Sequence, residues 1–322
     1  MKILGMGNAL VDVLARIEKD DILNELELPK GSMQLIDWNK LQQLNLVLEN
    51  LEKHLASGGS ASNTITAISK LGVTCGFLGK VGNDSYAEHF KKDLNKYGVT
   101  SHLIEDGQAS GVATTFISPD GERTFGTYLG AAAMLEAGEV TDDIFEGYNY
   151  FYIEGYLVQS LDLIRKAIKT AKNKGLKVVL DLASYNVVDA NRDFLLEIIP
   201  EYVDIVFAND DEAKSLLGLD AEEAVNKLAE ITDIAIVKTG EKGSLIKRGD
   251  ENISVPAHVV NCIDTTGAGD LYAAGFLYGL AKKNDLKIAG EIGTLLAGNV
   301  IQVIGPKMND EHWDRIIASL PQ

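Results

Sequence analysis

Short apolar segments alternate with stretches of helical periodicity along most of the 322-residue chain. Strand-like runs include KILGMGN, TCGFLGKVG, YNYFYIEG, LKVVLDLA, VDIVFAN and DIAIVKTG, and the helical patterns between and after them include SASNTITAISKLG, DSYAEHFKKDLNKYG and LDLIRKAIKTAKNKG. A succession of strand and helix is typical of a parallel sheet covered by helices on both faces. The pattern therefore predicts an α/β fold with a central, mostly parallel sheet.

Two stretches interrupt this pattern, around residues 13–37 and 100–129, where polar and apolar residues alternate as in GVATTFISPDGERTFGTYLG. The SPDGERT segment has the composition of a turn between two strands. Because the two stretches are far apart in sequence, they would have to meet in space, as a small antiparallel sheet that covers the parallel one. The predicted division is a large α/β domain of residues 1–12, 38–99 and 130–322 and a small β lid of residues 13–37 and 100–129.

The formal net charge of −17 argues against nucleic acid or an anionic membrane as the main partner. An anionic ligand would need positive potential supplied locally by its site. No apolar run approaches the length of a membrane span, and the N-terminal MKILGMGNAL lacks the pattern of a signal peptide. The two cysteines, Cys75 and Cys262, form neither a disulfide framework nor a zinc site by themselves. We expect a cytoplasmic protein.

Near the C-terminus, DTTGAGD ends an extended segment and opens the helical pattern GDLYAAGFLYGLAKK. The first N–H groups of a helix have no intrahelical partner, and Gly267, Ala268 and Gly269 leave them uncovered for an anion. A carboxylate beside a phosphate would be repelled, so Asp270 makes sense as a base that orients an attacking hydroxyl and accepts its proton. The simpler interpretation is a helix start with a capping aspartate and small residues for packing.

Other nucleotide motifs do not account for the sequence. The pattern G-x-x-x-x-G-K-[ST] does not occur, and GMGNAL lacks the third glycine of a dinucleotide-binding turn. A dehydrogenase is therefore a weaker interpretation. Neither H-E-x-x-H nor G-x-S-x-G occurs either.

DTTGAGD, in this setting, resembles the signature of the ribokinase-like (PfkB) family of carbohydrate and nucleoside kinases. The resemblance covers nearly the whole chain, in the family's order, through GMGNALVD (Gly5 to Asp12), GGSASN (Gly58 to Asn63), GKVGND, NDDE (Asn209 to Glu212) and KTGEKGS (Lys238 to Ser244). It implies phosphoryl transfer from ATP, with Mg²⁺, to an alcohol group. Under this resemblance Asp270 is the catalytic base, with Gly267, Ala268 and Gly269 as the anion hole.

The resemblance also implies which residues bind the two substrates. For the acceptor they are Asn8, Asp12, Gly58, Gly59 and Asn63, with Asp12 accepting hydrogen bonds from two hydroxyls. For the nucleotide they are Asn209, Glu212, Thr239, Gly240, Gly243, Asn299 and Arg123. Glu212 would hold Mg²⁺ through water, Arg123 would clamp the phosphate, and Asp264 and Thr266 match an optional site for a monovalent cation, potassium. Arg123 and the residues around Glu212 could also be a solvated hairpin tip and an ordinary helix cap.

The N-terminal sequence and the length of the lid resemble those of the adenosine kinase branch more than those of ribokinase. Phe125, Leu129 and Tyr156 fall where that branch stacks a base, and either Met33 or Gln34 would face the acceptor. The alternative is a sugar kinase of the fructose, ribose or 2-keto-3-deoxygluconate type, in which Glu154 could bind a hydroxyl; a ligand-sensing protein without activity is a third. The partners implied are a small nucleoside or sugar, with a monomer or homodimer as the assembly.

Overall fold

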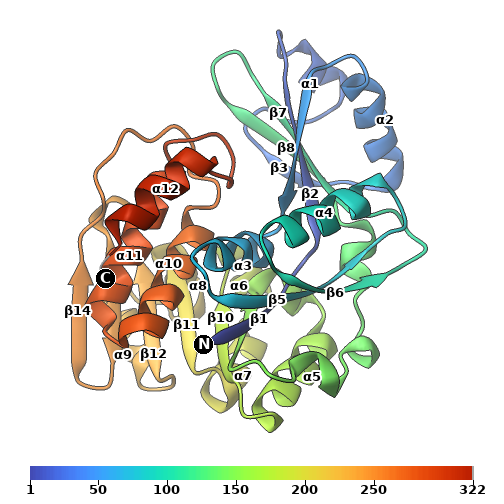
Figure 1. The fold of residues 1–322 in the computed structure, drawn as a ribbon. Helices are drawn as coiled ribbons and strands as arrows, with labels where there is room; N and C mark the ends of the chain where they lie inside the picture. The colour runs from blue at the N-terminus through green and yellow to red at the C-terminus, as the bar shows by residue number, and fades with distance from the viewer. Residues whose placement is uncertain (321–322) are drawn as a thin grey trace.

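The computed structural model describes residues 1–320 and contains two β-sheets of unequal size (Figure 1). Seven strands of the larger sheet run parallel, and two antiparallel strands complete one edge. Across the sheet the nine strands are β14 (Glu251–Val255), β13 (Ser244–Arg248), β12 (Ile234–Lys238), β11 (Ile205–Asn209), β10 (Lys177–Asp181), β9 (Tyr150–Glu154), β1 (Lys2–Met6), β5 (Thr74–Val81) and β6 (Thr100–Glu105). The predicted α/β class is confirmed.

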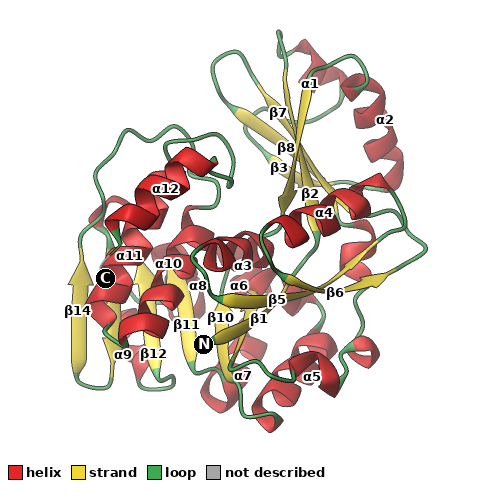
Figure 2. Ribbon diagram, in the orientation of Figure 1, coloured by secondary structure: helices red, strands yellow, loops and turns green. Residues whose placement is uncertain are grey.

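Helices cover both faces of the large sheet (Figure 2). Adjacent residues of a strand face opposite sides, so Ile3 belongs to one core cluster and Leu4 to the other. Because both faces are buried at the centre of the sheet, its central strands, such as those of Ile205–Asn209 and Ile234–Lys238, are nearly continuous apolar runs. One face carries α3 (Ser60–Lys70), α4 (Ser85–Lys96), α10 (Ala268–Lys283), α11 (Leu286–Val300) and α12 (Asp310–Ser319), and the other carries α5 (Leu161–Asn173), α6 (Tyr185–Ala190), α7 (Arg192–Tyr202), α8 (Asp210–Leu217) and α9 (Ala221–Ala229).

Short 3₁₀ helices connect several of these elements: η1 (Gly130–Met134), η2 (Ala137–Glu139), η3 (Asp142–Phe145), η4 (Gly155–Gln159) and η5 (Gly240–Lys242).

Helix α10 is fixed in place by a close approach to α11. A Cβ added at Gly275 would lie 2.8 Å from the Cα of Gly293, and one added at Gly279 would lie 2.6 Å from the Cα of Ala289. The small residues in this helix therefore let two backbones pack closely. The packing fixes the N-terminus of α10, where the predicted anion hole begins.

The smaller sheet has five strands: β3 (Met33–Leu35), β8 (Arg123–Tyr128), β7 (Gly111–Ile117), β2 (Leu10–Arg16) and β4 (Lys53–Gly58). One face packs on α1 (Asp21–Glu25) and α2 (Trp38–Leu48) through a core that includes Val13, Ala15 and Leu44. The alternate residues of β2, Leu10 and Asp12, face the cleft described below.

Strand pairing differs from the predicted ranges in three ways. Strand β6 lies inside the range 100–129 but pairs with β5 in the large sheet. Outside the predicted lid, β4 pairs into the small sheet and α2 packs on it. The small sheet is also mixed, since β2 pairs with β7, and β3 with β8, in parallel. Alternation shows that a segment is a strand, whereas its partner is chosen by long-range packing. The division into two domains stays a prediction.

Within residues 1–320, no helix has both the length and the apolar character needed to cross a membrane. Cys75 is buried, Cys262 is exposed, and both are free thiols.

Candidate active site

A cleft of about 1510 Å³ lies where residues of the small sheet meet the carboxyl ends of the parallel strands. This edge is where open α/β sheets bind ligands, because the connecting loops diverge there. The volume exceeds that of an ordinary single-ligand pocket, so it can hold an acceptor and a nucleotide together.

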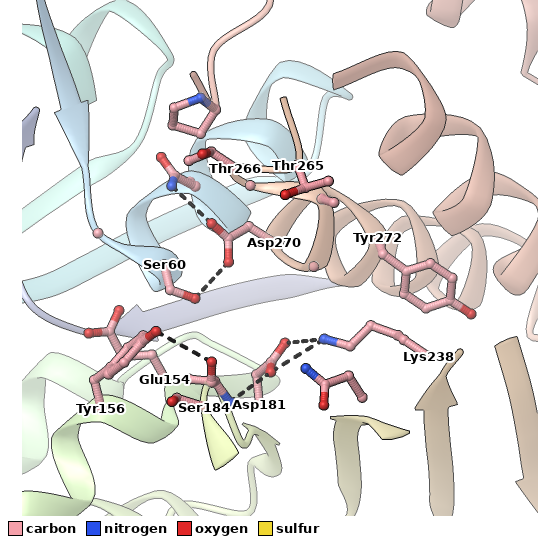
Figure 3. Close-up of a pocket in the computed structure, with 18 of the residues that line it drawn as sticks. Ser60, Glu154, Tyr156, Asp181, Ser184, Lys238, Thr265, Thr266, Asp270 and Tyr272 are labelled. Atoms are coloured by element: carbon pink, nitrogen blue, oxygen red, sulfur yellow. Dashed lines mark hydrogen bonds and ion pairs between the residues drawn. The ribbon is translucent and has the colours of Figure 1, made fainter. Parts of the chain in front are cut away.

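Asp270 lies in the first turn of α10, beside the cleft (Figure 3). The Ser60 hydroxyl donates a hydrogen bond to its Oδ1 (2.7 Å), and Nδ2 of Asn63 donates to its Oδ2 (2.9 Å). Burial raises the pKa of Asp270, and these two hydrogen bonds oppose that shift. Each oxygen keeps a free lone pair. The carboxylate is thus held in one orientation and can still accept a proton.

The predicted anion hole begins at Gly267, which caps α10 in the left-handed region with φ of +79°. A side chain at Gly267 would also crowd Pro306, because an added Cβ would lie 2.7 Å from the proline Cβ. The Ala268 N–H already donates to the Thr265 carbonyl oxygen (3.1 Å). Gly267, Ala268 and Gly269 all line the cleft, but one of the three predicted donors is used by the turn itself.

The predicted acceptor residues converge on Asp12, whose carboxylate lies against Gly58. A side chain at Gly58 would overlap that carboxylate, and one at Gly59 (φ +87°) would overlap the Asn8 carbonyl oxygen. Asn8, Asp12, Gly59 and Asn63 line the cleft, whereas Gly58 supports Asp12 from behind. Burial raises the pKa of Asp12 to about 7, and the charge of Lys307 opposes the shift.

Glu154 is buried, and its hydrogen bonds are used by the protein. Its Oε1 accepts from the backbone N–H (2.9 Å) and Nδ2 (2.8 Å) of Asn8, and its Oε2 accepts from the Ala61 N–H (2.8 Å). Burial raises its pKa to about 7. Glu154 therefore holds the end of β1 against the start of α3, and this geometry argues against the sugar-binding role considered for it.

An apolar group of side chains forms the part of the cleft that the small sheet covers. Met33 and Leu35 line it and remain 60% and 63% exposed, although both are large apolar residues. Gln34, between them, is not among the lining residues, so Met33 is the better candidate to face an acceptor. The predicted base-stacking residues Phe125, Leu129 and Tyr156 lie in the same cleft.

The predicted nucleotide residues are only partly brought together. Asn209 and Glu212 form a reciprocal cap at the start of α8, and both line the cleft, as do Gly240 and Gly243. The other three, Thr239, Asn299 and Arg123, do not line it. The Thr239 hydroxyl donates to the Gly243 carbonyl oxygen (3.0 Å), and Nδ2 of Asn299 donates to the Leu295 carbonyl oxygen (2.8 Å). The predicted phosphate clamp, Arg123, is instead paired with Asp264.

At α11, the residues before Asn299 that line the cleft are Thr294, Ala297 and Gly298. The helical phase thus turns Asn299 back toward its own helix.

Two buried carboxylates suit a magnesium ion. Asp181, at the end of β10, and Glu212 both line the cleft, and burial together with the charge of Asp181 raises the pKa of Glu212. Carboxylate oxygens are the ligands that Mg²⁺ prefers, and the ion keeps several waters, so two such groups suffice. Asp181 and Glu212 would hold hydrated Mg²⁺, which neutralises the charge of ATP phosphates.

The predicted potassium ligands form a closed network instead. Asp264 Oδ1 accepts from the N–H (3.1 Å) and hydroxyl (2.8 Å) of Thr266, and its Oδ2 accepts from the Gly305 N–H (2.6 Å). The Arg123 guanidinium lies 2.6 Å from the same Oδ2. A cation at Asp264 would have to replace Arg123, so these residues do not fit potassium in this arrangement.

Three lining residues that sequence reasoning did not assign are Ser60, Asp181 and Lys238, and a fourth, Lys307, lies outside the lining but acts on Asp12 through its charge. Ser60 and Lys238 lie inside segments that resemble family motifs, so their positions were open to inspection. Asp181 carries no motif of its own. Lys307 donates to the Thr66 hydroxyl (2.9 Å), and burial lowers its pKa to about 8.

Known proteins are similar to this chain in sequence and in fold. The chain is 36% identical to adenosine kinase from Sinorhizobium meliloti, whose crystal structure superposes with a TM-score of 0.85 over 98% of each chain. It is 35% identical to a probable sugar kinase from Rhizobium etli CFN 42, with a TM-score of 0.85 over 98% of this chain and 97% of that one. A 5-dehydro-2-deoxygluconokinase from Bacillus subtilis (strain 168) is 29% identical over 282 residues, or 83% of this chain and 87% of the relative.

The model of the pfkB family carbohydrate kinases matches residues 31–312. This match covers most of the chain, including the cleft residues from Met33 to Pro306. The family implies ATP and, usually, Mg²⁺. The chain therefore belongs to the PfkB family and is a kinase that phosphorylates an alcohol group.

Proposed function

We propose that this kinase transfers the γ-phosphoryl group of Mg-ATP to a primary hydroxyl of a purine nucleoside, with adenosine as the preferred acceptor. The observation that carries the proposal is the apolar group of Met33, Leu35, Phe125 and Leu129, which faces the cleft beside Asp12.

The apolar group suits a flat base better than a free sugar. Each sugar hydroxyl that leaves water needs a polar partner, and an apolar surface offers none. A purine instead gains from stacking against aromatic and aliphatic side chains. Tyr156 adds an aromatic face, and its hydroxyl is directed to the Ala183 carbonyl oxygen (3.4 Å). The bonded state of Glu154 removes one polar group that a sugar would need.

In the proposed reaction, Asp12 accepts hydrogen bonds from two ribose hydroxyls, and the primary hydroxyl faces Asp270. As the hydroxyl oxygen forms its bond to the γ-phosphorus, its proton passes to the Asp270 carboxylate, and the bond from phosphorus to the bridging oxygen of ADP breaks. Ser60 and Asn63 keep Asp270 oriented. Free N–H groups of the Gly267–Gly269 turn stabilise charge on the transferring group. Most of the catalysis is then positioning and electrostatics.

A sugar kinase is the second candidate. It is favoured by the similarity to the probable sugar kinase of Rhizobium etli and to the 5-dehydro-2-deoxygluconokinase of Bacillus subtilis. The sequence identities of these two proteins to this chain are close to that of the adenosine kinase of Sinorhizobium meliloti, so identity does not distinguish the two candidates. The apolar group of the cleft is the observation that favours the nucleoside.

The test compares kcat/KM for adenosine, guanosine, ribose, fructose and 2-keto-3-deoxygluconate with Mg-ATP. We expect adenosine to be used most efficiently. Tyr156→Ala should lower the efficiency for adenosine by about 1–3 kcal/mol, the usual contribution of one stacking contact. Tyr185→Ala is the control, since Tyr185 is an exposed tyrosine outside the cleft lining. A free sugar that outperforms every nucleoside would overturn the proposal in favour of the sugar kinase.

A further inference from the structure

Lys238 is the only lysine or arginine among the described residues that line the cleft. It lies at the end of β12, and its side chain points across the cleft toward Asp181 (Figure 3). Every other ionised lining group is a carboxylate: Asp12, Glu154, Asp181, Asp210, Glu212, Glu241 and Asp270. Binding a polyphosphate in a chain of net charge −17 therefore depends on local positive groups, of which Lys238 is the strongest side-chain source.

The ammonium group lies beside the anion hole. A Cβ added at Gly269 would lie 3.2 Å from Nζ of Lys238, so the nitrogen is next to the helix turn that exposes its N–H groups. The lysine belongs to β12 and the turn belongs to α10, so the two are distant in sequence. They meet at the edge of the large sheet, where β12 ends. A helix N-terminus and a lysine that converge in this way form an anion site with two independent kinds of donor.

The ion pair between Lys238 and Asp181 is loose. Nζ lies 3.3 and 3.5 Å from the two carboxylate oxygens of Asp181, although the lysine side chain is only 15% exposed and the aspartate 4%. Other ion pairs of shielded cations in this protein are tighter, such as Lys80 with Glu139 (2.8 Å) and Arg123 with Asp264 (2.6 Å). An ammonium group has three donors. Lys238 therefore keeps hydrogen-bonding capacity for a ligand in the cleft.

The chemistry of this side chain suits an anion. An ammonium group carries three donors and no acceptor, and it is the ordinary state of lysine at neutral pH. Lys238 is therefore suited to bind an anion in the cleft.

We propose that Lys238 is a further catalytic residue that donates hydrogen bonds to the γ-phosphoryl group during transfer, and that Asp181 positions it. No proton leaves the lysine: the hydroxyl proton still passes to Asp270, and the bond to the bridging oxygen of ADP still breaks. The proposal rests on the ATP-dependent half of the proposed function and holds for a nucleoside or a sugar acceptor.

The first test compares the kinetics of Lys238→Met and Lys238→Arg with those of the unmodified chain, using the best acceptor of the panel. Lys238→Met should lower kcat by about 10²–10³-fold, as for other charge-stabilising donors, with little change in the KM of the acceptor. Lys238→Arg should restore part of the rate, because it keeps the charge. Lys227→Met is the matched control, since Lys227 also forms an ion pair, with Glu230, but is 54% exposed and outside the cleft.

The second test needs no acceptor and so separates this proposal from the identity of the substrate. Binding of ADP and of a non-hydrolysable ATP analogue is measured by calorimetry. Lys238→Met should weaken binding of the ATP analogue and leave that of ADP unchanged, because only the analogue carries the γ-phosphate. Equal loss of both ligands, or a turnover close to that of the unmodified chain, would overturn the proposal.

Removing one partner of a buried ion pair can destabilise the fold. The double variant Lys238→Met/Asp181→Asn removes both charges together and keeps the test valid if the single variant unfolds. Because Asp181 would also hold Mg²⁺, binding to the double variant is compared with that to Asp181→Asn alone, without added Mg²⁺. We expect the double variant to melt near the unmodified chain and to show, relative to Asp181→Asn, the same selective loss of ATP-analogue binding. A folded double variant that binds the analogue and ADP as tightly as the unmodified chain would also contradict the role of Lys238.

Discussion

At the residue scale, the predicted base is a carboxylate that is held by neutral donors. Asp270 receives one hydrogen bond on each oxygen, from Ser60 and Asn63, and both donors come from α3, which packs beside α10. A cation in direct contact would make a carboxylate a much weaker base. Uncharged donors orient the carboxylate with a smaller loss of basicity. The arrangement suits a group that must be ionised and still take up a proton.

Asp270→Asn should therefore fold and bind ATP but lose at least about a hundredfold in kcat, the usual scale for removal of a general base. The asparagine can keep the hydrogen bonds to neighbouring side chains, so its melting temperature should stay close to that of the unmodified chain. Asp285→Ala, which removes only the cap of α11 outside the cleft, controls for simple loss of stability. A folded Asp270→Asn variant with near-normal kcat would refute the role of base.

The buried carboxylate of Asp12 makes a prediction about pH and stability. Burial raises its pKa from 3.8 to about 7, so the folded state holds this proton more tightly than the unfolded chain does. Ionisation of Asp12 consequently lowers the free energy of unfolding. This loss is absent well below pH 3.8, grows as the pH rises, and is complete above about pH 7. Without substrate, Asp12→Asn should raise the melting temperature more at about pH 8 than at about pH 5.

The control for that experiment is Asp314→Asn, because Asp314 is an exposed aspartate on α12 and its removal should show no such dependence. The same Asp12→Asn variant should lose acceptor binding if Asp12 accepts hydrogen bonds from the acceptor hydroxyls. A gain in melting temperature that is equal at both pH values would show that Asp12 is ordinarily solvated.

At the element scale, the small sheet and the N-terminus of α10 are joined by one ion pair. Arg123, at the start of β8, reaches Asp264 (2.6 Å) and the Thr266 hydroxyl (3.1 Å), and both charged side chains are shielded, with 12% and 7% exposure. Strand β8 also carries Phe125 into the cleft. Movement of the small sheet would therefore change the apolar group and the edge of the anion hole together.

Hydrogen exchange should reveal that movement. When a saturating acceptor is added, amides of β2, β3, β7 and β8 should exchange more slowly together, because closure buries the face that lines the cleft. Strand β6 should not respond, since it belongs to the large sheet despite lying in the predicted lid range. Unchanged exchange in the four strands would rule out a closing lid, and a response in β6 alone would place the movement elsewhere.

Arg123 also predicts the response to potassium. Because its guanidinium already neutralises Asp264, the rate of the unmodified chain should be the same in potassium chloride and in tetramethylammonium chloride. Arg123→Met should be slower, and potassium should restore part of its rate by taking the vacated charge. Lys30→Met is the control, since Lys30 pairs with Asp20 (2.7 Å) and Asp120 (2.5 Å) away from the cleft. Strong activation of the unmodified chain by potassium would contradict this arrangement.

At the scale of the whole molecule, several features follow from local sequence. Continuous apolar runs such as IVFAN and IAIVK specify strands buried on both faces, and the helical patterns between them specify the covering layers. The glycines at 267 and 269, followed by Asp270, specify a helix start open to an anion, because backbone N–H groups and small side chains need no distant partner to have that effect. The α/β class, the PfkB family and the position of the predicted base therefore depend on residues close together in the chain.

Tertiary structure alone decided the rest. The pairing of β4 rather than β6 with the small sheet, the contact of Lys238 with the anion hole and the ion pair of Arg123 with Asp264 each join residues that are far apart in sequence. Asn299 turns away from the cleft because the phase of α11 is set by packing. Periodicity specifies which residues form an element and which of its faces is apolar. Contacts between elements depend on the free energy of packing over the whole chain, and a local pattern does not specify that quantity.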